Sequence, residues 1–131
     1  MNIVESLASY LISIGYGTAL NTDVFIGGVP TIPSTAYWYI FSGGSPVTKN
    51  TTGEKIKSYS VQFFYRNVDA EDVYNKLQLI EVELNKSSCA QLSGFDTIEI
   101  EATVFPTDND IDLEERTVGT IQVAIKTYYK E

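Results

Sequence analysis

KIKSYSVQFFYRN, residues 55–67, runs through Val68 into DAEDVYNKLQLIEVELNK, residues 69–86, and the hydrophobic period changes between the two segments. In the first segment the side chains alternate with period two, which predicts a long β-strand with two distinct faces. The face toward the core holds Tyr59, Val61, Phe63 and Tyr65, and the outer face holds Ser58, Ser60, Gln62, Phe64 and Arg66. The outer face is polar except for Phe64, so it is a candidate contact surface.

The second segment has the period of an amphipathic helix. Asp69 is a favourable N-cap, Asp72 follows three residues later, and acidic residues in the first turn suit the positive end of the helix dipole. The apolar stripe consists of Val73, Leu77, Ile80 and Leu84. We therefore predict a helix from Asp69 to about Lys86 that packs on a sheet.

A shorter amphipathic helix is predicted near the start of the chain, where apolar residues recur at helical spacing behind Asn2, a favourable N-cap. The apolar residues are Ile3, Val4, Leu7, Ala8, Leu11 and Ile12, and Gly15 and Gly17 can end the helix. Its polar side carries Glu5 and serines in place of Lys or Arg. Packing on a sheet is therefore favoured over membrane binding.

Two strands are predicted between this helix and the long strand. A short one spans residues 23–26 and a stronger one spans residues 36–41. Pro30 and Pro33 lie between them and block regular pairing, which predicts an extended arm or an edge segment. Residues 42–53 are polar and rich in Ser, Thr, Gly and Asn, so we predict a mobile loop there.

The C-terminal third predicts two further strands. Their alternating apolar residues are Ile98, Ile100, Ala102 and Val104 in the first strand, and Val118, Ile121, Val123 and Ile125 in the second. Gly119 interrupts the second alternation, which predicts a β-bulge at that position.

Together these elements predict one α+β domain over residues 1–131, with an antiparallel twisted sheet of four to five strands and two helices packed on it. The order along the chain is α-β-β-β-α-β-β. A chain of 131 residues can bury roughly two-thirds of its unfolded surface without a metal or a disulfide.

The charge balance restricts the partners that the chain can bind. The 17 acidic and 9 basic side chains give a net charge of −8, which repels phosphate and anionic lipid. The nearest basic cluster is Lys49, Lys55 and Lys57, with Glu54 among them, and we interpret it as a solvated hairpin arm. Direct nucleic-acid binding and membrane association are therefore disfavoured.

The residue types give little support to catalysis. The chain has no His and only one cysteine, Cys89, so it lacks the usual proton shuttle and the usual base for an activated thiol. An enzyme would have to act through carboxylates and tyrosines. The glycine pairs lack the strand-to-helix phosphate motif, so no cofactor is predicted.

The acidic residues 108–115 allow two interpretations. Asp108, Asp110 and Asp112 have the Asp-x-Asp-x-Asp spacing that suits a hard cation such as Ca²⁺. The sixth position of a calcium loop needs Gly and is Leu113 here, and the twelfth needs Glu and is Gly119. A solvated hairpin tip is therefore favoured, and a small-ligand or calcium-binding module stays as the alternative function.

One segment carries a resemblance to a known family. Val61-Gln62-Phe63-Phe64-Tyr65-Arg66-Asn67, followed by Asp69-Ala70 and the helix stripe, resembles the central region of tailed-phage tail terminator proteins. It is also similar to the small minor capsid proteins of siphophages of Gram-positive hosts. In these families a strand of Val-Gln-hydrophobic-x-x-Arg texture runs into a helix that begins near an acidic-Ala pair. The element order and the length agree over nearly the whole chain.

The resemblance implies a structural virion protein of the phage tail or neck, assembled in the host cytoplasm. Six copies would form a ring on the tail tube, stop its growth and dock the head-completion or stopper protein. DNA would pass through the lumen without specific binding, so the partners would be further copies, the major tail tube protein and the stopper protein. The residues that we expect at these contacts are Phe64, Arg66, Pro30, Pro33, Tyr128, Asp108, Asp110 and Asp112.

Overall fold

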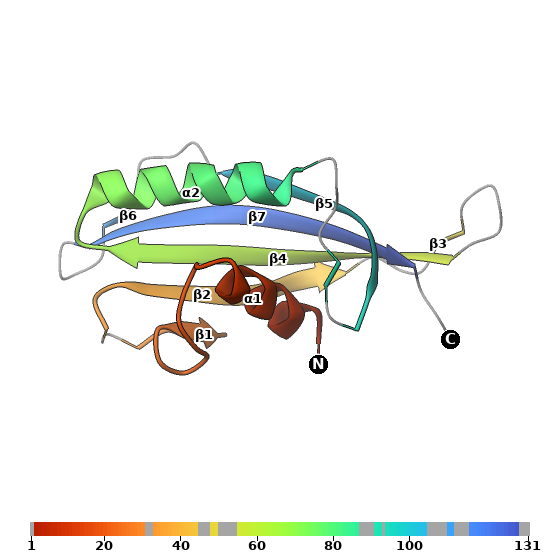
Figure 1. The fold of residues 1–131 in the computed structure, drawn as a ribbon, viewed down its shortest axis with the longest axis horizontal. Coiled ribbons are helices and arrows are strands. Elements are labelled where there is room, and N and C mark those ends of the chain that lie inside the picture. Colours follow the sequence, from red (N-terminus) through yellow and green to blue (C-terminus); the bar gives the residue numbers. More distant parts are fainter. Residues whose placement is uncertain are drawn as a thin grey trace.

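The computed structural model describes residues 2–30, 33–44, 48–49, 55–86, 91–92, 94–104, 110–111 and 116–128. Its elements are α1 (Ile3–Ser13), β1 (Val24–Ile26), β2 (Ala36–Gly44), β3 (Thr48–Lys49), β4 (Lys55–Asn67), α2 (Ala70–Leu84), β5 (Asp96–Val104), β6 (Asp110–Ile111) and β7 (Thr117–Tyr128). The predicted α+β class and the order of the main elements are confirmed (Figure 1).

One sheet joins all the strands in the order β1-β2-β4-β7-β5, with the short β3 paired to β4 and the short β6 paired to β7. β4 and β7 pair antiparallel along their lengths, from Ile56 opposite Tyr128 to Asn67 opposite Thr117. β5 also pairs antiparallel with β7, so β4 and β5 run parallel with β7 between them. β4, α2 and β5 therefore form a split β-α-β unit, and β7 fills its gap.

Both helices lie on one face of this sheet (Figure 1). α2 contacts β7, β5 and β4, and α1 contacts β2 and β1. The inward residues of the sheet are buried as predicted, and they include Val61, Phe63, Tyr65, Ile121, Val123 and Ile125. The Tyr10 hydroxyl of α1 donates to Glu83 Oε1 of α2 at 2.9 Å, which joins the two helices above this core.

Local hydrogen bonds explain where each helix begins. Asn2 Oδ1 accepts from the backbone N–H of Glu5 at 2.8 Å, and Glu5 Oε1 accepts from the backbone N–H of Asn2 at 3.4 Å. Asp69 Oδ1 accepts from the backbone N–H groups of Glu71 and Asp72. Both caps satisfy N–H groups that have no partner inside the helix, and both are the caps predicted from the sequence.

Gly119 has a packing role, and the prediction of a bulge at this position is wrong. It lies in continuous register opposite Tyr65 of β4. A Cβ on Gly119 would overlap Leu77 Cδ1 and would lie 2.8 Å from Val73 Cγ1. α2 therefore packs directly on the backbone of β7, and the missing side chain sets the separation of helix and sheet.

The edges of the sheet differ from the sequence prediction in two respects. The sheet is mixed where a wholly antiparallel one was predicted, since β1 pairs parallel with β2; the two prolines stand between these strands, as predicted, and a tight hairpin does not join them. β2 extends to Gly44, and Thr48–Lys49 form β3, so part of the predicted 42–53 loop belongs to the sheet. β4 is longer than the strand predicted over residues 36–41. Its first residues therefore pair with the end of β2 and with β3.

Gly119→Ala is expected to lower the free energy of unfolding by about 1–3 kcal/mol, because Leu77 or the whole of α2 must move to admit a methyl group. Gly28→Ala is the matched control, since a Cβ at Gly28 meets nothing within 4 Å, and it should change stability by less than about 0.5 kcal/mol. Urea denaturation followed by circular dichroism measures both variants. Equal midpoints would contradict the packing role.

Candidate interaction surfaces

The face of the sheet opposite the helices carries the outward side chains of β2, β4 and β7. Cross-strand register places Trp38, Phe64 and Thr120 in one row, Ile40, Gln62 and Gln122 in the next, and Ser60 and Ala124 in a third. We call these eight residues the open face. The rings of Trp38 and Phe64 stack with centroids 5.1 Å apart and planes 6° apart.

The open face contains no charged residue, although the chain has a net charge of −8. Charged side chains border it, with Glu99 and Glu101 on β5 and Lys126 near the end of β7. Ile40 is 38 % exposed near its centre. Because the cores of protein interfaces are depleted in charged residues, the open face has the composition of a protein contact surface.

Arg66 lies beside the open face but is covered there. It is 4 % exposed, its Nη2 donates to the carbonyl oxygens of Pro30 at 2.8 Å and Pro33 at 2.6 Å, and its Nε donates to that of Ser34 at 3.3 Å. Its guanidinium carbon lies 5.7 Å from the centroid of the Trp38 ring. Arg66 lies on the face that the sequence predicted, but three carbonyl groups of the same chain enclose its guanidinium, so in the single chain it is not exposed for a partner.

Arg66→Lys is expected to lower the free energy of unfolding by about 1–3 kcal/mol, because an ammonium keeps the charge but cannot span three carbonyl groups. Lys126→Ala is the control, since the Lys126 side chain is 54 % exposed and its nitrogen lies 3.8 Å from Glu99. Thermal denaturation and limited proteolysis between β1 and β2 measure the two variants. An Arg66→Lys protein as stable and as protease-resistant as wild type would argue against the clamp.

The structure brings together only some of the contact residues that the sequence predicted. Phe64, Arg66, Pro30 and Pro33 lie close together at one end of the sheet. Tyr128 is 39 % exposed and pairs with Ile56 toward the opposite end of β4. Asp108 and Asp112 lie outside the described residues, and only the backbone of Asp110 is described, in β6.

Trp38, Ile40 and Gln122 were not predicted as neighbours of Phe64. Their placement depends on which strands lie side by side, and periodicity within one strand carries no such information. The usable signal was the run of uncharged outward residues from Ser58 to Phe64 in the predicted long strand, a run that ends at Arg66, in a chain where 20 % of residues are charged.

Side chains from the last turn of α2 and from its C-cap, Asn85, bond to the outer edge of β5. Asn85 Nδ2 donates to the carbonyl of Ala102 at 2.7 Å, and Asn85 Oδ1 accepts from the Ala102 N–H at 2.8 Å. Glu81 Oε2 accepts from the Val104 N–H at 2.8 Å. Unpaired backbone groups at a sheet edge recruit further strands, and these side chains occupy them.

The start of β5 and the short strand β1 are closed in a similar way. The Gln91 side chain pairs with the carbonyl and the N–H of Thr97 at 3.0 and 3.2 Å. On β1, the Val24 N–H donates to the carbonyl of Ala19, and the Val24 carbonyl accepts from Asn21. At Thr97, Ala102 and Val104 of β5 and at Val24 of β1, backbone groups at the sheet edges are therefore already bonded within the chain.

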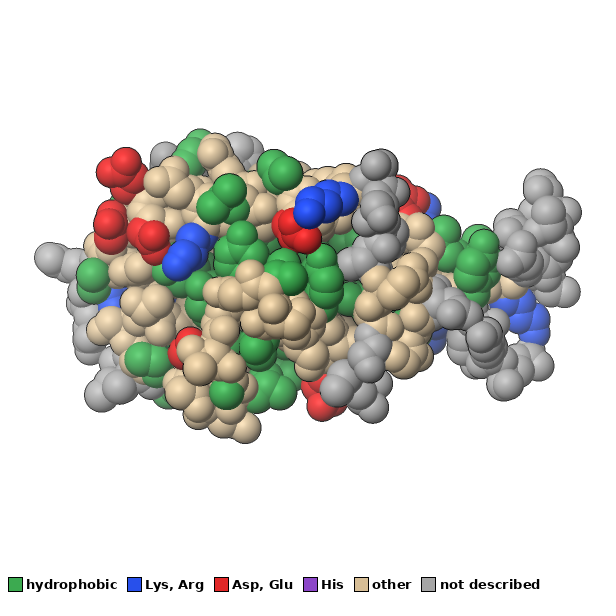
Figure 2. All heavy atoms as spheres, viewed as in Figure 1, with side chains coloured by type: hydrophobic (Ala, Val, Ile, Leu, Met, Phe, Trp, Pro, Cys, Tyr) green, Lys and Arg blue, Asp and Glu red, His purple; other side chains and the backbone are tan. Residues whose placement is uncertain are grey.

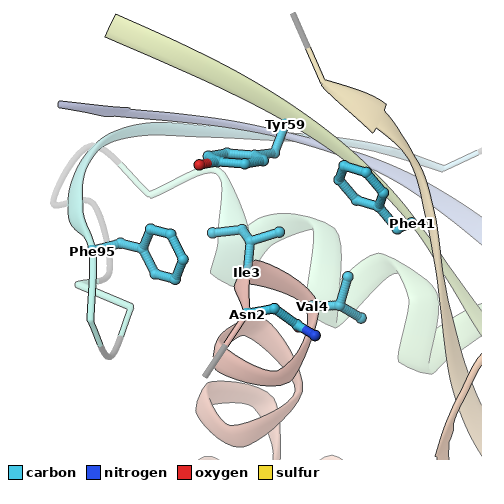
Figure 3. Close-up of a pocket in the computed structure, with 6 residues that line it drawn as sticks. All are labelled: Asn2, Ile3, Val4, Phe41, Tyr59 and Phe95. Carbon is cyan, nitrogen blue, oxygen red and sulfur yellow. The ribbon is translucent and has the colours of Figure 1, made fainter. Parts of the chain in front are cut away.

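An apolar pocket opens where α1 begins. It has a volume of about 410 Å³ and is lined by Asn2, Ile3, Val4, Phe41, Tyr59 and Phe95. Figure 3 shows Ile3 pointing toward the rings of Tyr59 and Phe95, while Val4 points toward Phe41. Phe41 is 51 % exposed at the mouth. The lining suits an aliphatic side chain better than a polar substrate.

The turn between β4 and α2 lies at the other end of β4. The Tyr65 hydroxyl donates to Asp72 Oδ2 at 2.6 Å, and Asn67 Nδ2 donates to the same oxygen and to the Tyr65 hydroxyl, each at 2.9 Å. Lys76 Nζ lies 3.8 Å from this carboxylate. These bonds tie the strand to the first turn of the helix. Val68 lies between them and is 64 % exposed.

The same bonds lower the pKa of Asp72 below its ordinary value of 3.8, and the hydrogen bond from Tyr65 is the largest cause. A carboxyl with a lowered folded-state pKa stabilises the protein above its unfolded pKa, and this stability is lost as the pH falls through the folded pKa. Asp72→Asn is therefore expected to lower Tm at pH 7 and to reduce the loss of Tm between pH 4 and pH 2. Glu71→Gln, at an exposed neighbouring position, is the control. The idea fails if Asp72→Asn and wild type show parallel Tm curves over that range.

Comparison with protein families matches residues 10–129, from within α1 to just beyond β7, to a model described as bacteriophage tail terminator protein. The chain belongs to the bacteriophage tail terminator family. This confirms the resemblance carried by the β4–α2 segment. No curated protein matches the chain.

The buried tyrosines of this tail terminator are held in the neutral form. Burial raises the pKa of Tyr37 to about 12 and also raises the pKa values of Tyr39 and Tyr65. Hydrogen bonds lower the pKa values of Asp72 and Glu83. General acid–base catalysis works best with a pKa near the working pH, and all five of these groups are shifted away from neutrality.

Two further observations concern other kinds of site. Within the described ranges, the tail terminator has no group of three or more His, Cys, Asp or Glu placed to hold a metal ion. Neither α1 nor α2 is long and apolar enough to cross a membrane. The acidic residues 108–115, on which the calcium interpretation depends, lie outside the described part of the chain except for β6.

Proposed function

We propose that this tail terminator forms a ring at the end of the tail tube, ends tube growth and joins the tube to the head-completion protein. We take the ring to be a hexamer, as the family resemblance implies, and DNA to pass through its lumen without specific binding. Family membership supports the structural role in the tail. The open face supports the contact with a partner protein.

The open face is the observation that carries this proposal. Ile40 is 38 % exposed on this face and Phe64 is half-buried, while Trp38 is 8 % exposed beside them. None of the three has a charged neighbour in its row, and Glu99 and Glu101 stand at the border of the face. Burying charges against a partner costs several kcal/mol for each ion, and this face avoids that cost. It therefore suits a broad neutral protein surface such as the rim of a tube.

The net charge supports a conduit for DNA more than a DNA-binding role. Each copy contributes −8, and a ring multiplies this charge around a lumen through which phosphate must pass. Lys57 of the basic cluster contacts a ring of its own chain, since its Nζ lies 5.6 Å from the centroid of the Tyr59 ring. DNA is thus repelled by the ring as a whole and is not retained.

We also infer that the protein acts without catalysis. The pocket at the start of α1 is apolar. The pKa values of Tyr37, Tyr39 and Tyr65 are raised and those of Asp72 and Glu83 are lowered, which moves these groups away from the protonation equilibrium that proton transfer requires. The chain contains no His. These features support a role that depends on surfaces.

Ile40→Asp is expected to weaken binding to purified tail tubes by about tenfold or more, because it places a carboxylate that must be desolvated at the centre of the open face. Val82→Asp is the matched control, since Val82 is 66 % exposed on α2 and the change adds the same charge away from the open face. Co-sedimentation with tubes measures binding, and electron microscopy locates the protein on the tube.

Wild-type protein found at tube ends, together with arrested tube growth, is the expected result. A wild-type chain that never binds tubes would overturn the proposed function. Equal tube binding by Ile40→Asp and wild type would show that the open face is not part of the contact with the tube.

A further inference from the structure

We propose that copies of this chain join head to tail, with the β4–α2 turn of one copy seated in the apolar pocket of the next. This inference rests on the proposed function, because it specifies the contact by which a ring closes. The pocket accepts Val68, and the charged residues that flank the two surfaces pair across the junction.

The pocket has the shape and the chemistry to accept an aliphatic side chain. Its walls come from α1, β2, β4 and the residues before β5, and they meet around the Ile3 side chain (Figure 3). Tyr59 and Phe95 meet edge to face with ring centroids 6.0 Å apart. Phe41 leaves half of its surface exposed at the mouth. Filling this space with an apolar group removes aromatic surface from water, which favours binding.

The β4–α2 turn presents a suitable group in a fixed position. Val68 exposes 64 % of its surface, and the bonds among Tyr65, Asn67 and Asp72 hold the backbone on either side of it. Asn67 Oδ1 also accepts from the Asp69 N–H at 3.2 Å. Because the turn is ordered before binding, seating Val68 costs little conformational entropy.

The two surfaces lie too far apart for one copy to satisfy itself. Tyr59 lines the pocket and Val68 follows the end of β4. At about 3.3 Å per residue, the strand separates them by roughly 30 Å. Two different patches at opposite ends of one molecule make a heterologous contact, and repetition of such a contact produces a ring when the rotation closes.

The charges at the two ends are complementary. Lys55 and Lys57 lie on β4 beyond the pocket residue Tyr59, and Asp69 and Glu71 are exposed at the turn. Figure 2 shows several acidic side chains over the start of α2, with a basic side chain beside them, and basic side chains at the opposite end of the molecule. Copies with a charge of −8 repel one another in most orientations. The head-to-tail orientation brings opposite charges together.

Sheet extension does not compete with this arrangement along the described edges. Asn85, Glu81 and Gln91 occupy backbone groups of β5, and Val24 of β1 bonds within its own loop. We therefore assign the contact between copies to side chains at the two ends of the sheet.

Thiol cross-linking tests the proposed junction. In a Cys89→Ala background, Asn2→Cys places a thiol at the lip of the pocket and Val68→Cys places one at the turn. A bismaleimide with a spacer of about 10 Å, added to protein assembled on tail tubes, is expected to link successive copies into a ladder of dimers, trimers and larger species. Because Asn2→Cys removes the N-cap of α1, circular dichroism first checks that the variant is folded.

The controls separate this junction from other contacts. A mixture of the two single-cysteine proteins should stop at dimers, because each copy then contributes one reactive end. Asn2→Cys combined with Val82→Cys should give no ladder, since Val82 is equally exposed but lies on α2 away from the turn.

Tube binding without a ladder would overturn the head-to-tail contact and leave the proposed function standing. A ladder of equal yield with Val82→Cys would also overturn it. Absence of both tube binding and cross-linking would remove the proposed function and this inference together.

Discussion

The pairing of β4 with β7 supports every other part of the molecule. It runs from Ile56 opposite Tyr128 to Asn67 opposite Thr117, and both partners have their other edge paired as well, with β2 and with β5. The inward side of this pair receives α2, which approaches closely because Gly119 has no side chain. The outward side forms the middle of the open face. One antiparallel ladder thus organises both the core and the candidate contact surface.

Local sequence signals predicted the parts of the fold that depend on neighbouring residues. The alternation in β4 placed Phe63 in the core and Phe64 outside, and Asn2 and Asp69 marked the starts of the two helices, because period and capping act within a few residues. Gly119 was misread for the opposite reason. A glycine in a strand is compatible with a bulge or with close packing, and only the position of α2 distinguishes them.

Long-range pairing also explains which surfaces the sequence did not reveal. Arg66 was assigned to the correct face, but its burial depends on carbonyl groups of Pro30 and Pro33, which the parallel β1–β2 connection brings across the sheet. The apolar pocket combines residues from α1, β2, β4 and the segment before β5. No motif within one segment predicts such a pocket. The uncharged outward residues of β4, in contrast, can be identified from the alternation in the sequence.

The position of β7 late in the chain affects the order in which the sheet folds. β7 is the last strand that the structure describes, yet it occupies a central position between β4 and β5. Pairings between distant segments are slow to form, and during synthesis β4, α2 and β5 are all made before their common partner. Until β7 arrives, β4 and β5 each have an unpaired inner edge. We therefore expect the sheet to close only after β7 has been translated, and the finished surfaces to form after that.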